Sequence, residues 1–188
     1  NFEDKKIYEM FELDPNKKVI LFFGGGEFGL GKERTTQILR VFVQKVPNYQ
    51  IVAVSGKNEK MKEVFEQLVS ENHAQDRVRV LGFTDKVPEL MHIASLVVTK
   101  PGGLTTTESL ASTLPMVIIN PIPGQEEENA EFLVENGVGV WIKKEDSPEE
   151  VIANLFASDE LEKMKKNTEK FTKQYSTKTI CEMLLNNI

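Results

Sequence analysis

The sequence predicts an α/β fold, a Rossmann-like open parallel sheet of about six strands with helices on both faces. Short apolar runs alternate with stretches of helical period along most of the chain, which is the pattern of consecutive βα units. Several runs are apolar throughout, as strands buried on both faces are. Glycines follow two of these runs, where a strand turns sharply into a helix.

The first half of the chain supplies three of the expected strands. Between them, Ile38, Leu39, Phe42 and Val46 recur at the spacing of an amphipathic helix, which Pro47 stops. Charges alternate along 77–81, so this strand is expected at an edge of the sheet. The expected strands cover 18–23, 50–54 and 77–81, and the helices between and after them cover 35–46, 60–71 and 87–93.

The second half continues the alternation and then becomes helical only. Asn136 and Gly137 form a helix C-cap, and Ser147 followed by Pro148 forms a helix start. The expected strands cover 96–99, 116–119 and 138–142, and the helices cover 105–113, 127–135, the segment from 148, 160–175 and 178–185. A further helical segment precedes the turn at 14–16 and is expected to be a linker.

Composition excludes several function classes. The 188 residues suffice for one core, and a net charge of −6 argues against general binding of nucleic acid. A single cysteine, Cys181, and two histidines exclude a disulfide framework and argue against a Cys- or His-rich metal site. Apolar runs stay far below the ~18 residues of a membrane span.

The first glycine-rich loop, 24–32, contains parts of two nucleotide-binding patterns. A phosphate-binding loop needs Ser or Thr after Lys32, but Glu33 stands there. A dinucleotide site needs an acid at the end of the second strand, and the segment 54–58 has none. The remaining interpretation is a turn that brings an anionic ligand to backbone N–H groups, and the alternative is a tight turn without a ligand.

The loop after the fourth strand, 99–104, is a second candidate anion site. Gly102 and Gly103 turn the chain into a helix that begins with threonines, so its N-terminal amides suit a phosphate. Glu108 lies about one turn into this helix, where its carboxylate could accept both hydroxyls of a ribose. The alternative is an ordinary glutamate near a helix start.

Two further loops complete the candidate site. Gln125 and Glu126 stand at a helix start after a proline-stiffened loop and suit vicinal sugar hydroxyls, although a solvated helix start is the alternative. Phe83 follows the third strand and could read the face of a base, or belong to the core. Together the loops indicate a nucleotide-sugar site. His73 and His92 lie outside them, so no general base is evident.

At this point a family resemblance is visible. The stretch 99–111, then 114–116 and 121–130, resembles the C-terminal donor domain of GT-B glycosyltransferases. It is most similar to processive diacylglycerol glucosyltransferases and monogalactosyldiacylglycerol synthases, and more distantly to the peptidoglycan N-acetylglucosaminyltransferase. The resemblance runs from about Lys18 to Trp141 and continues more weakly to the C-terminus. It implies that 1–17 is a linker or helix from a preceding domain and that 18–188 is the donor-binding domain.

The resemblance also implies roles for individual residues. The glycine-rich loop would lie near the diphosphate, the backbone after Phe83 near the uracil, and the start of the helix after Gly102 at the phosphates. The acid in that helix would hold the ribose, and the Gln-Glu pair would contact the donor sugar. The donor-binding residues so implied are Gly25, Gly26, Phe83, Thr84, Gly102, Gly103, Leu104, Thr105, Glu108, Gln125 and Glu126.

The activity implied by the resemblance is transfer of glucose or galactose from UDP-hexose to diacylglycerol with inversion. The acceptor surface and the catalytic base would belong to an N-terminal domain that this sequence lacks, so the chain alone is expected to be inactive. No metal or cofactor is implied, and the intact enzyme would sit peripherally on the cytoplasmic face of the membrane. Two alternatives stay open: a UDP-N-acetylglucosamine enzyme of the same fold, either a transferase or a 2-epimerase, and a nucleotide-binding module without chemistry.

Overall fold

The chain folds around a single open sheet in the computed structural model, which describes residues 2–24 and 31–174. All paired strands run parallel, and their order is β3-β2-β1-β4-β5-β6. This confirms the predicted sheet and the edge position of the strand near 77–81. The strands are β1 (Val19–Phe23), β2 (Gln50–Val54), β3 (Val78–Leu81), β4 (Ala94–Thr99), β5 (Met116–Ile119) and β6 (Gly139–Ile142).

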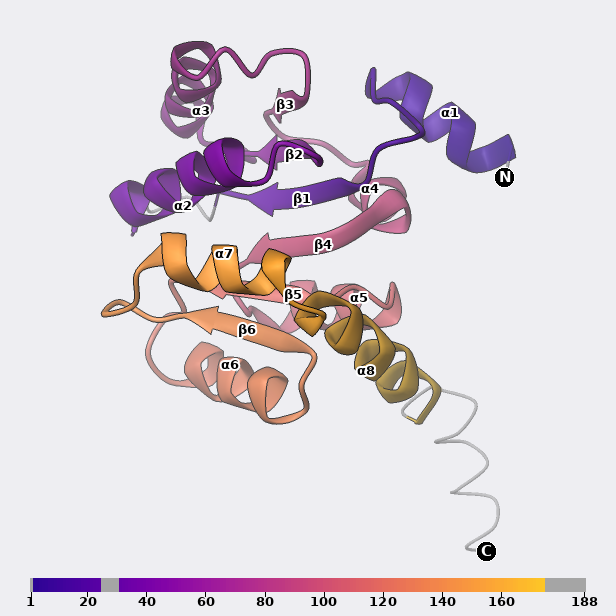
Figure 1. The fold of residues 1–188 in the computed structure, drawn as a ribbon, viewed down its shortest axis with the longest axis vertical. Helices are drawn as coiled ribbons and strands as arrows, with labels where there is room; N and C mark the ends of the chain where they lie inside the picture. Colours follow the sequence, from indigo (N-terminus) through magenta and orange to yellow (C-terminus); the bar gives the residue numbers. More distant parts are fainter. Residues whose placement is uncertain (1, 25–30, 175–188) are drawn as a thin grey trace, which may run out of the picture.

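Helices connect the strands and cover both faces of the sheet (Figure 1). In the described part of the chain they are α1 (Phe2–Met10), α2 (Lys32–Lys45), α3 (Glu59–Glu71), α4 (Val87–Ile93), α5 (Gly103–Ala111), α6 (Gln125–Glu135), α7 (Pro148–Ala157) and α8 (Glu160–Gln174). The predicted helix at 178–185 lies outside the described residues.

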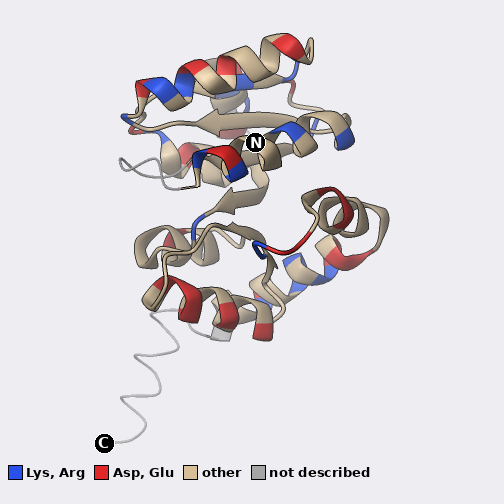
Figure 2. Ribbon diagram, turned by 90° about the vertical axis from the view of Figure 1, so that its left-hand side faces the viewer, with Lys and Arg blue, Asp and Glu red and all other residues tan. Residues whose placement is uncertain are grey.

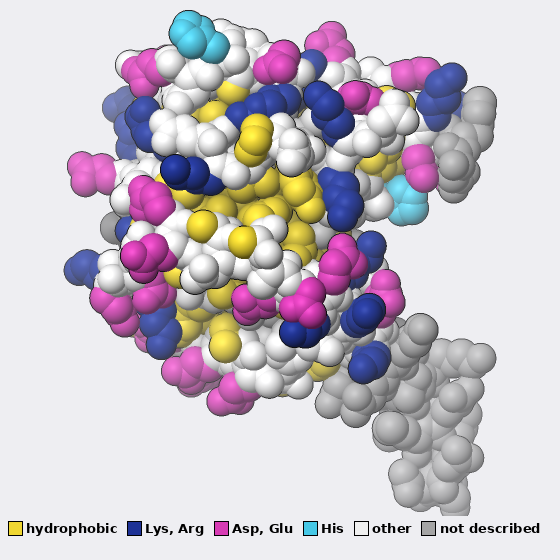
Figure 3. Space-filling model, in the orientation of Figure 1, with side chains coloured by type: hydrophobic (Ala, Val, Ile, Leu, Met, Phe, Trp, Pro, Cys, Tyr) yellow, Lys and Arg dark blue, Asp and Glu magenta, His cyan; other side chains and the backbone are white. Residues whose placement is uncertain are grey.

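One face of the sheet packs against α2, α3, α7 and the start of α8. Alternate side chains of the strands, such as Ile20 and Phe22, are fully buried there, because successive residues of a strand point to opposite faces. Phe22 makes edge-to-face contacts with Phe42 of α2 and Phe65 of α3, at centroid distances of 6.3 and 5.9 Å. Figure 3 shows hydrophobic side chains gathered across the middle of this side of the molecule, with charged side chains around them.

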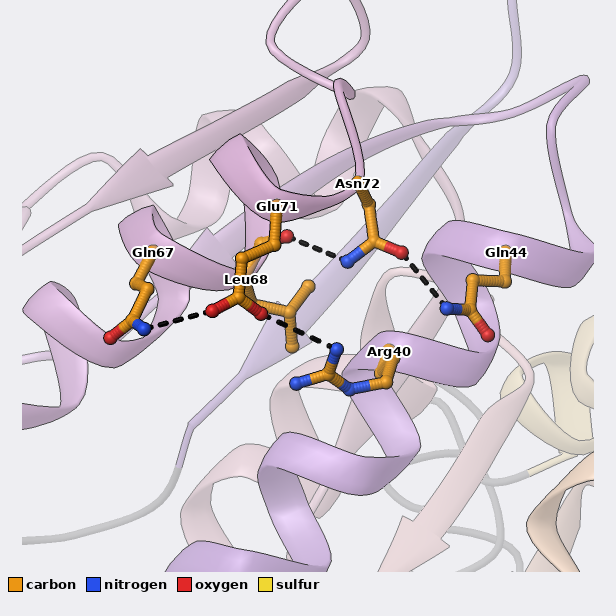
Figure 4. Close-up of polar contacts among 6 residues, drawn as sticks. All are labelled: Arg40, Gln44, Gln67, Leu68, Glu71 and Asn72. Atoms are coloured by element: carbon orange, nitrogen blue, oxygen red, sulfur yellow. Dashed lines mark hydrogen bonds and ion pairs between the residues drawn. The ribbon is translucent and has the colours of Figure 1, made fainter.

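Near their carboxyl ends, α2 and α3 are joined by polar side chains (Figure 4). Arg40 Nη1 lies 3.5 Å from Glu71 Oε2, and Gln44 Nε2 donates to Asn72 Oδ1 at 2.9 Å. Gln67 donates to the other oxygen of Glu71 at 2.8 Å. These exposed contacts join the two helices above the apolar layer, and each contributes little stability by itself.

The opposite face packs against α1, α4, α5 and α6. Leu21, Val97 and Ile118 of the strands are fully buried among the side chains of these helices. Helix α8 reaches this face at its end, where Phe171 packs on Phe132 of α6 with centroids 5.7 Å apart, and Thr172 donates to the carbonyl oxygen of Leu110. Helix α8 therefore contacts both apolar layers.

The segment before the sheet packs on it closely. Ile7 and Leu13 belong to the second apolar layer, and each exposes less than a tenth of its surface. Asp4 Oδ1 lies 2.9 Å from His92 Nε2, which joins α1 to α4. The prediction that 1–17 leads from a preceding domain stays a prediction, but the helix itself is part of this folded unit.

The predicted elements agree with the structure to within a few residues. Ser147 accepts a hydrogen bond from the N–H of Glu150 at 3.3 Å, and Gly137 has φ +63 after α6, as the capping patterns predict. Three helices begin two or three residues earlier than predicted, α2 at Lys32, α5 at Gly103 and α6 at Gln125. Within the described residues, no helix has the length and apolar character that would be required to cross a membrane.

Candidate functional site

The carboxyl ends of the parallel strands meet at one edge of the sheet, which the arrowheads of β1, β4 and β6 mark on the left of Figure 1. Ligands of open α/β sheets bind at this edge. The loops singled out in the sequence follow β1, β3, β4 and β5, so the topology brings all of them to this edge. Gly25 and Gly26 lie outside the described residues.

A first cavity of about 310 Å³ opens at this edge, between the ends of β1, β2 and β4 and the starts of α5 and α6. It brings together three of the predicted site residues from two different loops, Gly102, Thr105 and Glu126. The residues that line it are Phe23, Val54, Gly56, Thr99, Lys100, Gly102, Thr105 and Glu126.

The start of α5 is open to this cavity. Its N-cap, Gly102, has no side chain that could satisfy the first N–H groups, and no acidic residue lies in the first turn. A Cβ built on Gly103 would meet no atom within 4 Å. Free amides and the positive end of the helix dipole therefore face open space beside Lys100, which suits an anion.

The start of α6 has the opposite character. Its first turn holds Glu126, Glu127 and Glu128, and all charged residues of α6 are glutamates, whereas Figure 2 shows both charge signs interspersed along other helices. Glu126 Oε2 accepts a hydrogen bond from the N–H of Ile122 at 2.7 Å, so the carboxylate is held by its own loop. An acidic wall repels phosphate but accepts hydrogen bonds from hydroxyl groups.

The other predicted residues stand around the first cavity rather than in its wall. Gln125 is exposed and Leu104 is 76% exposed. Glu108 is half-buried and has no ion-pair partner among the described residues. It follows Thr105 by three positions on α5, so both side chains lie on the same side of the helix.

The loop after β3 places an aromatic ring in solvent. Phe83 is 70% exposed, so it is not a core residue, and Lys57 Nζ lies 5.6 Å from its ring centroid. Thr84 Oγ1 accepts a hydrogen bond from the N–H of Lys86 at 3.1 Å, which stabilises the turn that follows the ring. This loop follows β3, the outermost strand next to β2, and lies at the carboxyl ends of the strands like the other candidate loops.

A second cavity, of about 550 Å³, lies on the other side of Lys100, which contributes to both. It is bounded by the start of α2, the loop after β5 and the end of β6. Sequence reasoning missed this cavity, because its walls come from positions more than 100 residues apart. Arg34 illustrates this distance, since its Nη2 donates to the carbonyl oxygens of Lys143 and Asp146 at 2.9 and 2.7 Å.

Asn120 is a site residue that the sequence did not single out. It has φ +44, in the left-handed region that asparagine tolerates better than most residues, and its Nδ2 donates to Thr35 Oγ1 at 2.8 Å. The side chain thereby ties the end of β5 to the start of α2. In the described part of the chain, no group of three or more His, Cys, Asp or Glu side chains could hold a metal ion.

An open, all-parallel sheet with helices on both faces defines a Rossmann-like domain, and the uncapped start of α5 lies at the carboxyl ends of its strands. Residues 19–182 match the sequence model of the glycosyltransferase family 28 C-terminal domain. The chain belongs to this family, as the resemblance in the sequence predicted.

Curated relatives cover almost all of this chain. A protein of Bacillus subtilis (strain 168) is 36% identical over 180 residues, which is 95% of this chain and 46% of the relative. One of Staphylococcus aureus (strain JH9) is 38% identical over 180 residues, 94% of this chain and 44% of the relative. Both are called processive diacylglycerol beta-glucosyltransferase. The chain spans about half the length of the curated relatives it matches.

Solved structures share the fold at lower identity. Anabaena HepE, solved in complex with UDP and glucose, has a TM-score of 0.68 at 18% identity, over 99% of this chain and 52% of that one. WaaG, a glycosyltransferase involved in lipopolysaccharide biosynthesis, has a TM-score of 0.67 at 17% identity, over 93% and 47%. The fold is therefore that of the C-terminal half of a GT-B glycosyltransferase, as predicted.

Proposed function

We propose that this chain is the donor-binding domain of an enzyme that transfers glucose or galactose from UDP-hexose to diacylglycerol with inversion at the anomeric carbon. The observation that carries the proposal is the first cavity, where the uncapped start of α5 and Lys100 face open space. The names of the relatives support the lipid acceptor and the sugar transferred.

The diphosphate is assigned to the start of α5. Its bare amides and the ammonium of Lys100 would offset the charge that develops on UDP as it leaves, without a metal ion or cofactor. Gly103 and Leu104 belong to this helix start, and the resemblance adds Gly25 and Gly26 of the glycine-rich loop as neighbours of the diphosphate.

The uridine is assigned to the side of the cavity that faces β2 and β3. Glu108, on the same side of α5 as Thr105, would accept hydrogen bonds from both ribose hydroxyls. The loop with Phe83 and Thr84 would meet the uracil through its backbone and the exposed ring.

The hexose is assigned to the acidic start of α6. Glu126 lines the cavity and Gln125 stands beside it, and both accept hydrogen bonds from sugar hydroxyls. The related peptidoglycan enzyme has Gln-Gln at this pair, so Gln-Glu favours a hexose without an N-acetyl group. A UDP-N-acetylglucosamine enzyme of the same fold is the second candidate.

The remaining parts of the reaction are assigned outside this chain. The catalytic base and the acceptor surface would belong to an N-terminal domain, because the resemblance to GT-B enzymes places them there. We assign the intact enzyme to the cytoplasmic face of the membrane as a peripheral protein, where its lipid acceptor would be available.

Calorimetric titration with UDP, UDP-glucose, UDP-N-acetylglucosamine and NAD tests the proposal. UDP and UDP-glucose are expected to bind, and Glu108→Gln should weaken UDP binding by about 1–3 kcal/mol through loss of charge-assisted hydrogen bonds. Glu135→Gln, at the exposed end of α6, is the matched control and should leave the affinity unchanged. Binding of NAD without UDP would overturn the donor assignment, and tighter binding of UDP-N-acetylglucosamine than of UDP-glucose would favour the second candidate.

A further inference from the structure

Much of the wall of the second cavity is apolar. Pro121, Ile122 and Pro123 form one side, and Trp141 and Ile142 at the end of β6 form another. Ile122 is 48% exposed, so part of this apolar wall is open to solvent. A cavity of about 550 Å³ with such walls suits an apolar ligand of more than a few carbon atoms.

Hydrogen-bond donors stand at the rim of this apolar wall. Arg34 lines the cavity, and its Nε is buried without a hydrogen-bond acceptor in the described part of the chain, although Nη2 is fully engaged. Lys100 and Lys144 add two ammonium groups on long aliphatic stems. Since this Nε has no surface open to the cavity, Lys100 and Lys144 are the donors that a ligand with carbonyl oxygens would meet.

The position of the cavity narrows the choice of ligand. Lys100 is a wall of both cavities, so a molecule in the second cavity would lie beside the diphosphate and hexose assigned to the first. The substrate that must approach the donor there is the acceptor.

We infer that the second cavity holds the glycerol ester region and the first acyl methylenes of the neutral diacylglycerol acceptor. The apolar walls take the methylenes, and Lys144 donates to an ester carbonyl oxygen. This inference rests on the proposed function, and it assigns to the donor domain a share of acceptor binding.

The chain contains its own reporter for this cavity. Trp141 is the only tryptophan of the sequence and lines the cavity wall, so its fluorescence responds to an apolar ligand placed against it. Titration of the chain with dioctanoylglycerol, below its solubility limit, should shift Trp141 emission to shorter wavelength in a saturable manner.

Two matched variants test the location. Ile122→Ser removes an exposed side chain from the cavity and should raise the dissociation constant for dioctanoylglycerol by about fivefold or more. Val134→Ser removes an equally exposed one, 43% against 48%, from α6 outside the cavity, and should change it by less than about twofold. Calorimetric UDP affinity, unchanged in both, shows that each variant is folded.

The outcomes separate this inference from the donor assignment. No saturable emission shift, equal loss in both variants, or the same shift with methyl glucoside in place of the lipid would each overturn the lipid assignment. If UDP binds and dioctanoylglycerol does not, only the inference fails. If the lipid binds and UDP does not, the donor assignment fails and with it the identification of the lipid as the acceptor, and only lipid binding by the second cavity stands.

Discussion

Gly31 and Gly103 border the same edge of the sheet, and the structure gives them different reasons to be glycine. Gly31 has φ +79, and a Cβ built on it would lie 2.7 Å from Asn120 Nδ2, so backbone conformation and packing both require glycine. Gly103 has ordinary helical surroundings, with nothing within 4 Å of a Cβ. The first is needed by the fold, whereas the space beside the second is open, as the proposed diphosphate site requires.

Alanine substitution should separate these two roles. Gly31→Ala is expected to reduce the free energy of unfolding by about 1–3 kcal/mol, because it forces a strained φ and a clash. Gly103→Ala should leave that free energy within about 0.5 kcal/mol of the parent value, since it lies in a helix, but should weaken UDP binding roughly tenfold by filling the open space. Urea unfolding and calorimetry measure the two quantities. A Gly103→Ala protein with full UDP affinity would remove the diphosphate from this helix start.

At the scale of the elements, the side chain of Asn129 joins helices α5 and α6. Asn129, in the second turn of α6, donates from Nδ2 to the carbonyl oxygen of Pro101 at 2.9 Å. Pro101 precedes Gly102, the N-cap of α5. The acidic start of α6 and the open start of α5 are therefore held at a fixed separation, as a ligand that spans both requires.

Asn129→Ala removes this hydrogen bond between α6 and the loop before α5. The expected loss in the free energy of unfolding is about 0.5–1.5 kcal/mol for one hydrogen bond, and UDP-glucose affinity should fall with it. Asn136→Ala is the control, because Asn136 Nδ2 donates at 2.8 Å to Phe132 of its own helix and touches no loop of the site. Loss of stability without any loss of UDP-glucose affinity would show that this hydrogen bond stabilises the fold but does not contribute to ligand binding.

At the scale of the whole molecule, both histidines lie away from the candidate site. His73 follows α3 and His92 ends α4, and each of these helices leads back to the amino end of a strand. The cavities lie at the carboxyl ends, on the opposite edge. Neither imidazole can therefore act as a base on a substrate bound there.

We expect the chain alone to bind UDP without transferring sugar. With UDP-glucose and diacylglycerol in mixed micelles, product should stay at background, while saturating UDP raises the melting temperature, since a ligand that binds only the folded state stabilises it. Chromatographic assay of the lipid product and a thermal melt provide the two readouts. Glycolipid formed above background by the purified chain would contradict the assignment of the base to another domain.

The layered fold was predictable because apolar strands buried on both faces leave a continuous pattern in the sequence. The start of α5 was placed two residues late, because Gly102 makes no side-chain cap that could mark it. The pairing of Asn120 with Thr35, and of Arg34 with the carbonyl oxygens of Lys143 and Asp146, depends on tertiary packing between distant segments. For this reason sequence motifs indicated the site of the first cavity, whereas no motif indicated the second.

Because Lys100 lines both cavities, we expect the binding of the two proposed ligands to be thermodynamically linked. Whatever an occupant of one cavity does to the ammonium group alters the affinity of the other cavity, and by linkage the effect is equal in both directions. The factor by which donor changes lipid affinity must equal the factor by which lipid changes donor affinity. A single lysine between the two proposed ligands would therefore make their binding cooperative, favourably or unfavourably, within one small domain.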